Sequence, residues 1–296
     1  MRKAWKTALA VVVAFGLWGM GLPCTVQAGE ALRVTVSILP QKYFVDRIGG
    51  DRVAVGVMVL PGASPAIYEP KPRQMADLVK SRIYFATGVP FEGVWISKFE
   101  AANPEMRIVR TDKGIEKRAM KARHDHGGED HDGGIQDPHV WLSPPLVMLQ
   151  ARHILDALCR EDPENREGYE SNYRGFISDL VELDLKIRSL FSGIQGRPRF
   201  MVYHPSWGYF SEAYGLEQIP VEMEGKAPSP RALEDLIRYA GQEGVRVVFV
   251  QPQFPTRSAE TIARAIGGQA IEADPLAPDW ANNLLKAAGV FRRALK

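Results

Sequence analysis

Short apolar runs rich in β-branched residues alternate along the chain with longer segments whose apolar residues recur every three or four positions. The strand-like runs fall into two sets, at 32–38, 53–59 and 83–86, and then at 200–203, 219–222, 245–250 and 269–273. Such alternation is typical of α/β proteins with mainly parallel sheets. We therefore predict two parallel-sheet α/β lobes, one built from each set of strands.

A long helix-like segment separates the two sets of strands and spans about 163–194. Its apolar residues recur with the spacing of one helix face, at Phe176, Leu180, Leu183, Ile187 and Leu190. This spacing predicts a single long amphipathic helix that joins the lobes as a rigid strut. The predicted boundaries are an export signal over 1–28, an N-terminal lobe over 30–145, a linking helix over 163–195 and a C-terminal lobe over 197–296.

The N-terminal segment carries basic residues, then an apolar stretch over 8–22, then small residues that end at Ala28. This order predicts an export signal that is cleaved after Ala28, and hence a periplasmic or otherwise exported protein. A retained membrane anchor is the alternative, but the apolar stretch is short for a membrane span. A lipid anchor on Cys24 is disfavoured because Pro23 stands where lipoprotein signals have a small residue.

Cleavage would change the charge balance, because three of the 37 basic residues and none of the 35 acidic residues lie in the signal. The mature chain would keep 34 basic and 35 acidic residues, a net charge of −1. A surface this balanced gives no reason to expect a nucleic-acid partner. Cys159 would be the remaining cysteine, which excludes a disulfide framework and predicts a buried structural thiol.

Three residues with good metal-binding side chains, His139, His204 and Asp274, each stand beside a proline where an apolar run ends. His204 and Asp274 directly follow strand-like runs, so they are expected at carboxyl ends of strands, where open α/β sheets bind ligands. Pro205 predicts a helix start directly after His204. Imidazole nitrogen and carboxylate oxygen together suit Zn(II) and its neighbours, so these residues predict a metal site assembled by folding.

A second group of histidines, His124, His126 and His131, lies within a glycine- and charge-rich segment over 111–136. This composition predicts a mobile loop. Imidazoles mixed with carboxylates make the loop a candidate auxiliary metal collector, and a merely polar linker is the alternative.

A hydrolytic enzyme is a different class of function that the same residues could support. Three protein ligands and a water would resemble a catalytic zinc site, with Glu222 or Glu224 as the base. However, the sequence contains no His-Glu-x-x-His pair, no Gly-x-Ser-x-Gly turn and no glycine-rich phosphate loop.

Several longer motifs extend this pattern over nearly the whole mature chain: LPGASP at 60–65 with YEP at 68–70, DPHVWLSP at 137–144, HPSWGYF at 204–210, EGKAPSP at 224–230, QPQF at 251–254 and DPL at 274–276. With these motifs the chain resembles the metal-specific (zinc and manganese type, cluster A-I) solute-binding proteins of ABC transporters, and within them the zinc-type subgroup. The resemblance implies two α/β lobes joined by one long backbone helix, with a metal cleft between them.

The resemblance also assigns ligand positions, since His139, His204 and Asp274 match those of the family. A histidine rather than a glutamate at position 204 is similar to the zinc-type subgroup. The chain departs from the family pattern at Ala66, where a histidine usually provides the first ligand, and at Gln251, where a glutamate is common. Both departures are expected to weaken cation binding.

Three explanations of Ala66 remain open: a water completes the site, a loop histidine such as His124 does so, or the site has changed its cargo. We expect an exported, monomeric, non-enzymatic protein that binds Zn(II) as cargo and delivers it to an ABC permease in the membrane. Mn(II) or another first-row metal is the alternative cargo. The alternative functions are a zinc-dependent hydrolase with a three-ligand site and a metal-buffering or adhesin protein with a degenerate transport site.

Overall fold

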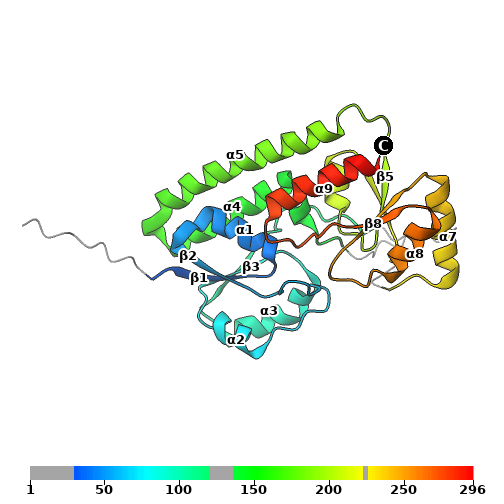
Figure 1. Ribbon diagram of the computed structural model, residues 1–296. Coiled ribbons are helices and arrows are strands. Elements are labelled where there is room, and N and C mark those ends of the chain that lie inside the picture. The colour runs from blue at the N-terminus through cyan, green and yellow to red at the C-terminus, as the bar shows by residue number, and fades with distance from the viewer. Residues whose placement is uncertain (1–29, 121–135, 223–225, 296) are drawn as a thin grey trace, which may run out of the picture. The chain divides into compact units, whose positions relative to one another are not determined.

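The structure is a computed structural model that describes residues 30–120, 136–222 and 226–295 (Figure 1). The predicted signal over 1–28 lies outside these ranges, as do Glu224 and the loop histidines His124, His126 and His131. Residues 31–296 form one compact unit. Within the described ranges, no helix combines the length and hydropathy that crossing a membrane requires.

The N-terminal lobe contains a four-stranded parallel sheet in the order β2-β1-β3-β4. Its strands are β1 (Leu32–Val36), β2 (Val53–Val57), β3 (Ile83–Ala86) and β4 (Arg107–Arg110). The connecting helices are α1 (Leu39–Gly49), η1 (Gly50–Arg52), α2 (Pro72–Leu78) and α3 (Pro90–Ala102). Figure 1 shows α1 on one face of this sheet and α2 and α3 on the other. Helices on both faces explain why β3 is buried and apolar along its whole length.

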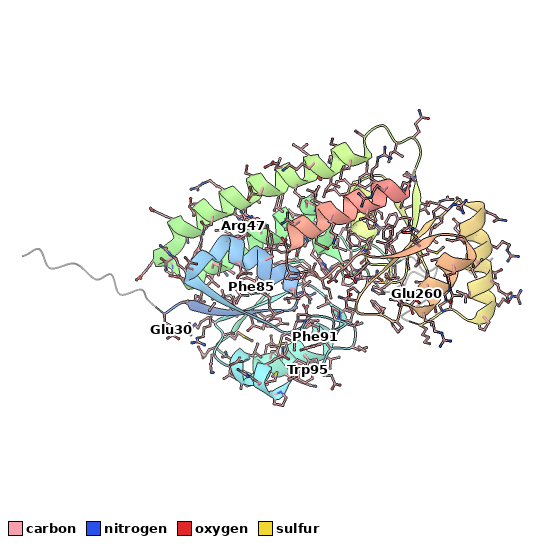
Figure 2. All side chains as sticks on the ribbon, in the orientation of Figure 1. Glu30, Arg47, Phe85, Phe91, Trp95 and Glu260 are labelled. Carbon is pink, nitrogen blue, oxygen red and sulfur yellow. The ribbon has the colours of Figure 1, made fainter. Side chains whose placement is uncertain are left out.

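Aromatic residues fill much of the space between this sheet and its helices. Phe85 on β3 and Phe91 on α3 are 0% and 3% exposed, and Trp95 lies one turn further along α3 (Figure 2). Tyr84 and Phe99 pack with their ring centroids 5.0 Å apart. These contacts hold α3, and with it the preceding residue Val89, against the sheet.

The C-terminal lobe repeats the arrangement with a parallel sheet in the order β6-β5-β7-β8. Its strands are β5 (Arg199–Val202), β6 (Glu217–Pro220), β7 (Val247–Val250) and β8 (Gln269–Glu272). Its helices are α6 (Gly208–Ala213), α7 (Pro230–Gln242), α8 (Arg257–Ala265) and α9 (Trp280–Ala294). The predicted fold class, two parallel-sheet α/β lobes, is therefore confirmed.

A helical segment links the two sheets through η2 (Val140–Leu142), α4 (Pro144–Glu161), η3 (Pro163–Asn165) and α5 (Arg166–Phe191). The predicted long helix is confirmed as α5, which has 26 residues. It begins at Arg166 instead of Pro163 because the Asp162 carboxylate accepts hydrogen bonds from the Asn165 amide (2.7 Å) and the Tyr169 hydroxyl (2.6 Å), which stabilises a separate turn.

The core is continuous from one sheet to the other. Helix α5 packs against α1, α4 and α9 (Figure 1). Phe44 on α1 and Trp280 on α9 meet edge to face, with ring centroids 5.0 Å apart. The same apolar cluster contains residues of both sheets, such as Val34 and Phe249. Since relative motion of the lobes would disturb this shared packing, we expect only limited opening of the cleft.

Candidate metal site

His204 lies at the carboxyl end of β5, where its backbone is fixed by a neighbouring strand. The Gln251 side chain follows β7, accepts a hydrogen bond from the His204 N–H (3.1 Å) and donates one to the His204 carbonyl (2.8 Å). Gln251 is 1% exposed, so these bonds are shielded from water. An amide can both donate and accept in this way, whereas an ionised glutamate can only accept.

The predicted helix start at Pro205 is wrong, because α6 begins at Gly208. Residues 204–207 form a tight turn in which the Ser206 N–H donates to the His204 carbonyl (2.8 Å). Position 208 requires a glycine because the Asp137 side chain lies so close that a Cβ there would be 2.7 Å from Asp137 Oδ2. The turn and the glycine thus let the Asp137 loop pack directly against the start of α6.

His139 lies just before η2 and is 7% exposed. Its Nδ1 lies 2.7 Å from Asp137 Oδ1, which also accepts the His139 backbone N–H at 3.0 Å. Asp137 is itself 1% exposed. Because a carboxylate can only accept, Nδ1 carries the proton and Nε2 keeps its lone pair.

His204 is oriented in the same manner by a second buried carboxylate. Its Nδ1 lies 2.6 Å from Oε1 of Glu222, which is 3% exposed. A carboxylate on the far nitrogen is the usual partner of a metal-binding histidine, since it fixes the tautomer and makes the ligand more basic. Within the described parts of the chain, neither His139 Nε2 nor His204 Nε2 has a hydrogen-bond partner.

The structure brings the two imidazoles together. Their ring centroids are 5.2 Å apart, and the His204 ring stacks on Phe254 at 4.6 Å. Both line a cavity of about 190 Å³. The cavity is also lined by groups from both lobes, including Ala66, Val89, Met120, Glu222, Gln253 and Leu276. Two oriented imidazole donors on one cavity are an arrangement that can bind a metal ion.

Asp274 does not join the two histidines in this conformation. It lines a smaller neighbouring cavity of about 40 Å³, which shares Gln253 and Leu276 with the larger one. Its Oδ1 accepts hydrogen bonds from Gln253 Nε2 (2.8 Å) and the Leu276 N–H (2.9 Å). Across the described residues, no three His, Cys, Asp or Glu side chains are grouped closely enough to hold a metal. Asp274 therefore stays a predicted ligand.

Burial lowers the pKa of His139 below its ordinary value of 6.5, although the hydrogen bond that its Nδ1–H donates to Asp137 opposes this change. At neutral pH the His139 imidazole is therefore uncharged, which is the form that binds a metal.

The two orienting carboxylates were not identified as such from the sequence. Asp137 could have been found from its position two residues before His139, a spacing at which an aspartate often bonds the following backbone. The position of Glu222 is explained by the strand register. Val202 pairs with Pro220, so His204 and Glu222, each two residues further on, lie side by side. Glu222 is thus bonded to His204, which argues against its predicted use as a hydrolytic base.

The chain is similar to components of zinc-uptake systems both in sequence and in structure. The family model described as "Zinc-uptake complex component A periplasmic" (ZnuA) matches residues 34–287. The high-affinity zinc uptake system protein ZnuA of Bacillus subtilis is 28% identical over 254 residues, which cover 81% of this chain and 77% of the relative. A crystal structure of ZnuA superposes with a TM-score of 0.83 at 39% identity, covering 90% of this chain and 100% of the other. A zinc-bound ZnuA deletion mutant gives a TM-score of 0.82 at 40% identity, covering 90% and 99%.

Proposed function

The chain belongs to the family of periplasmic zinc-uptake components ZnuA, and on this basis we propose that it captures Zn(II) between His139 and His204. This family consists of solute-binding components of zinc-uptake complexes, not of enzymes, and its members act with an ABC permease. The observation that carries the proposed site is the pair of imidazoles, each held at Nδ1 by a buried carboxylate. Two neutral nitrogen donors favour Zn(II) over Mn(II), which prefers oxygen.

Asp274 is proposed as a further ligand. Its Oδ1 is held by two hydrogen bonds, so Oδ2 is the oxygen that would turn to the ion. A carboxylate would offset part of the cation's charge in a site whose imidazoles are neutral. Release to the permease would follow from opening of the cleft, which separates the ligands contributed by different segments.

We propose that residues 1–28 are an export signal cleaved after Ala28, and that the protein is a monomer without a nucleic-acid partner. The proposed domains are 30–145, 163–195 and 197–296. We propose His124, His126 and His131 as an auxiliary loop that collects metal.

Zinc binding is expected to weaken as the pH falls, because protons compete with the metal for the imidazoles. Burial lowers the pKa of His139, so the loss of zinc affinity that comes from protonating His139 begins below pH 6.5. Below that lowered pKa, each displaced proton costs about tenfold in affinity per pH unit. Zinc titrations between pH 7.5 and 5 would measure the profile.

The control for this profile is His153→Gln, because His153 lies on α4 and bonds the Lys113 carbonyl at 2.9 Å, outside the cavity. Its profile should match that of the wild type. An affinity that stays constant over the whole pH range would contradict histidine ligation.

Glu222→Gln is expected to weaken zinc binding by roughly tenfold to a hundredfold, the usual effect of losing a carboxylate that supports a metal-binding histidine. The neutral amide makes His204 less basic and no longer fixes its tautomer. Glu217→Gln is the matched control, since Glu217 lies on β6, the strand that leads to Glu222, but pairs with Arg199. Equal zinc affinities for both variants and the wild type would contradict the proposed role of Glu222.

The proposed function is tested by titrating zinc into the chelator-stripped mature protein against a chromophoric chelator. We expect one tight site per chain, with Mn(II) displaced by equimolar Zn(II). A protein that takes up no zinc, or prefers Mn(II), would overturn the proposal.

A further inference from the structure

Gln253 lies between the histidine cavity and Asp274. It follows β7 by three residues, in the same loop as Gln251, and it lines both the larger cavity and its smaller neighbour. It therefore contacts the space next to His139 and His204 while its side chain bonds the third predicted ligand.

The hydrogen bonds fix which way the Gln253 amide points. Its Nε2 donates to Asp274 Oδ1 at 2.8 Å, and only the nitrogen can do so because an ionised carboxylate has no proton to give. Gln253 Oε1 is therefore turned away from that carboxylate. This oxygen is buried and has no hydrogen-bond partner among the described residues.

A buried amide oxygen without a partner destabilises a folded protein, and its presence beside a binding site calls for a functional explanation. Other buried side-chain atoms without a partner belong to Thr87, Gln150, Trp207 and Ser211. None of these residues lines the histidine cavity. The unpaired oxygen of Gln253 therefore differs from these other atoms in belonging to a residue that lines the histidine cavity.

We propose that Gln253 Oε1 is a ligand of the bound metal, which deepens the proposed function and rests on it. Zinc takes four ligands, and the methyl group of Ala66 provides none. His139, His204, Asp274 and Gln253 would supply four donors without position 66. The terminal torsion of a glutamine is broad, so the amide can turn Oε1 toward an ion bound in the cavity that Gln253 lines. The Asp274 charge on Nε2 polarises the amide and strengthens its oxygen as a donor.

The first test replaces the amide by a hydrocarbon of similar size. Gln253→Leu is expected to weaken zinc binding about tenfold to a hundredfold. Gln150→Leu is the matched control, because Gln150 is also buried with an unpaired amide but lies on α4 outside the cavity. Its zinc affinity should equal that of the wild type.

A second variant separates direct ligation from a role in holding Asp274. Gln253→Glu keeps an oxygen for the metal but cannot donate to Asp274 when ionised. If Gln253 is a ligand, this variant binds zinc at least as tightly as the wild type. If Gln253 only positions Asp274, Gln253→Glu weakens binding as much as Gln253→Leu, and the proposal is overturned.

The two proposals fail in different ways. Loss of zinc binding in His139→Ala with unchanged binding in Gln253→Leu would overturn the role of Gln253 and leave the histidine site intact. Unchanged binding in His139→Ala would overturn the proposed function itself. Thermal melting without zinc checks that each variant is folded.

Discussion

Replacing His204 by alanine is expected to weaken zinc binding by roughly 100- to 1000-fold. A tetrahedral protein zinc site provides about 10–16 kcal/mol, so one of four ligands accounts for about 2.5–4 kcal/mol. The imidazole is held between the Glu222 carboxylate at 2.6 Å and the stacked ring of Phe254. His139→Ala should have a similar effect. Competitive zinc titration of both variants would measure the loss.

His153→Ala is the control for these variants, and its zinc affinity should be that of the wild type. Removing His204 also leaves the buried Glu222 carboxylate without its partner, which destabilises the fold. Each variant is therefore melted without zinc to show that it is folded at the temperature of the titration. Folded His139→Ala and His204→Ala proteins with wild-type affinity would refute the histidine site.

Replacing Ala66 by histidine is expected to tighten zinc binding by roughly tenfold to a hundredfold, since it adds an imidazole donor from the N-terminal lobe. Ala66 lines the histidine cavity and its side chain is exposed, so a larger residue meets no packing barrier. The expected gain in zinc affinity is smaller than the loss on removing a ligand, because the imidazole of Ala66→His would replace an existing donor or water. Competition with a chelator of high zinc affinity would measure the change.

Ile67→His is the matched control for this gain. Ile67 is the next residue, is 83% exposed and does not line the cavity. The Ile67→His variant should bind zinc with the wild-type affinity. If Ala66→His binds zinc no more tightly than Ile67→His, position 66 is not directed at the bound ion.

Most of the fold could be predicted from the sequence because burial on both faces of a parallel strand leaves a clear apolar run. Strands β3 and β7 are of this kind. The missed strand β4 has Arg107 and Arg110 at its ends and only two apolar residues between them, since it lies at the edge of its sheet. An edge strand buries little, so its sequence resembles a loop.

The candidate site was only partly predictable. His139 and His204 were recognisable because each stands beside a proline where an apolar run ends. The sequence could not show that Gln253 intervenes between these histidines and Asp274, because that contact depends on how two loops 21 residues apart pack together. Similarly, Gln251 was predicted to weaken the site by its missing charge, whereas the structure shows it holding the His204 backbone.

The most direct test of the account is a crystal structure of the zinc-loaded mature protein, with anomalous diffraction measured at the zinc absorption edge. We expect an anomalous peak at about 2.0–2.1 Å from Nε2 of both His139 and His204, the normal zinc–imidazole distance. A zinc-loaded crystal whose anomalous peaks all lie away from these two nitrogens would contradict it.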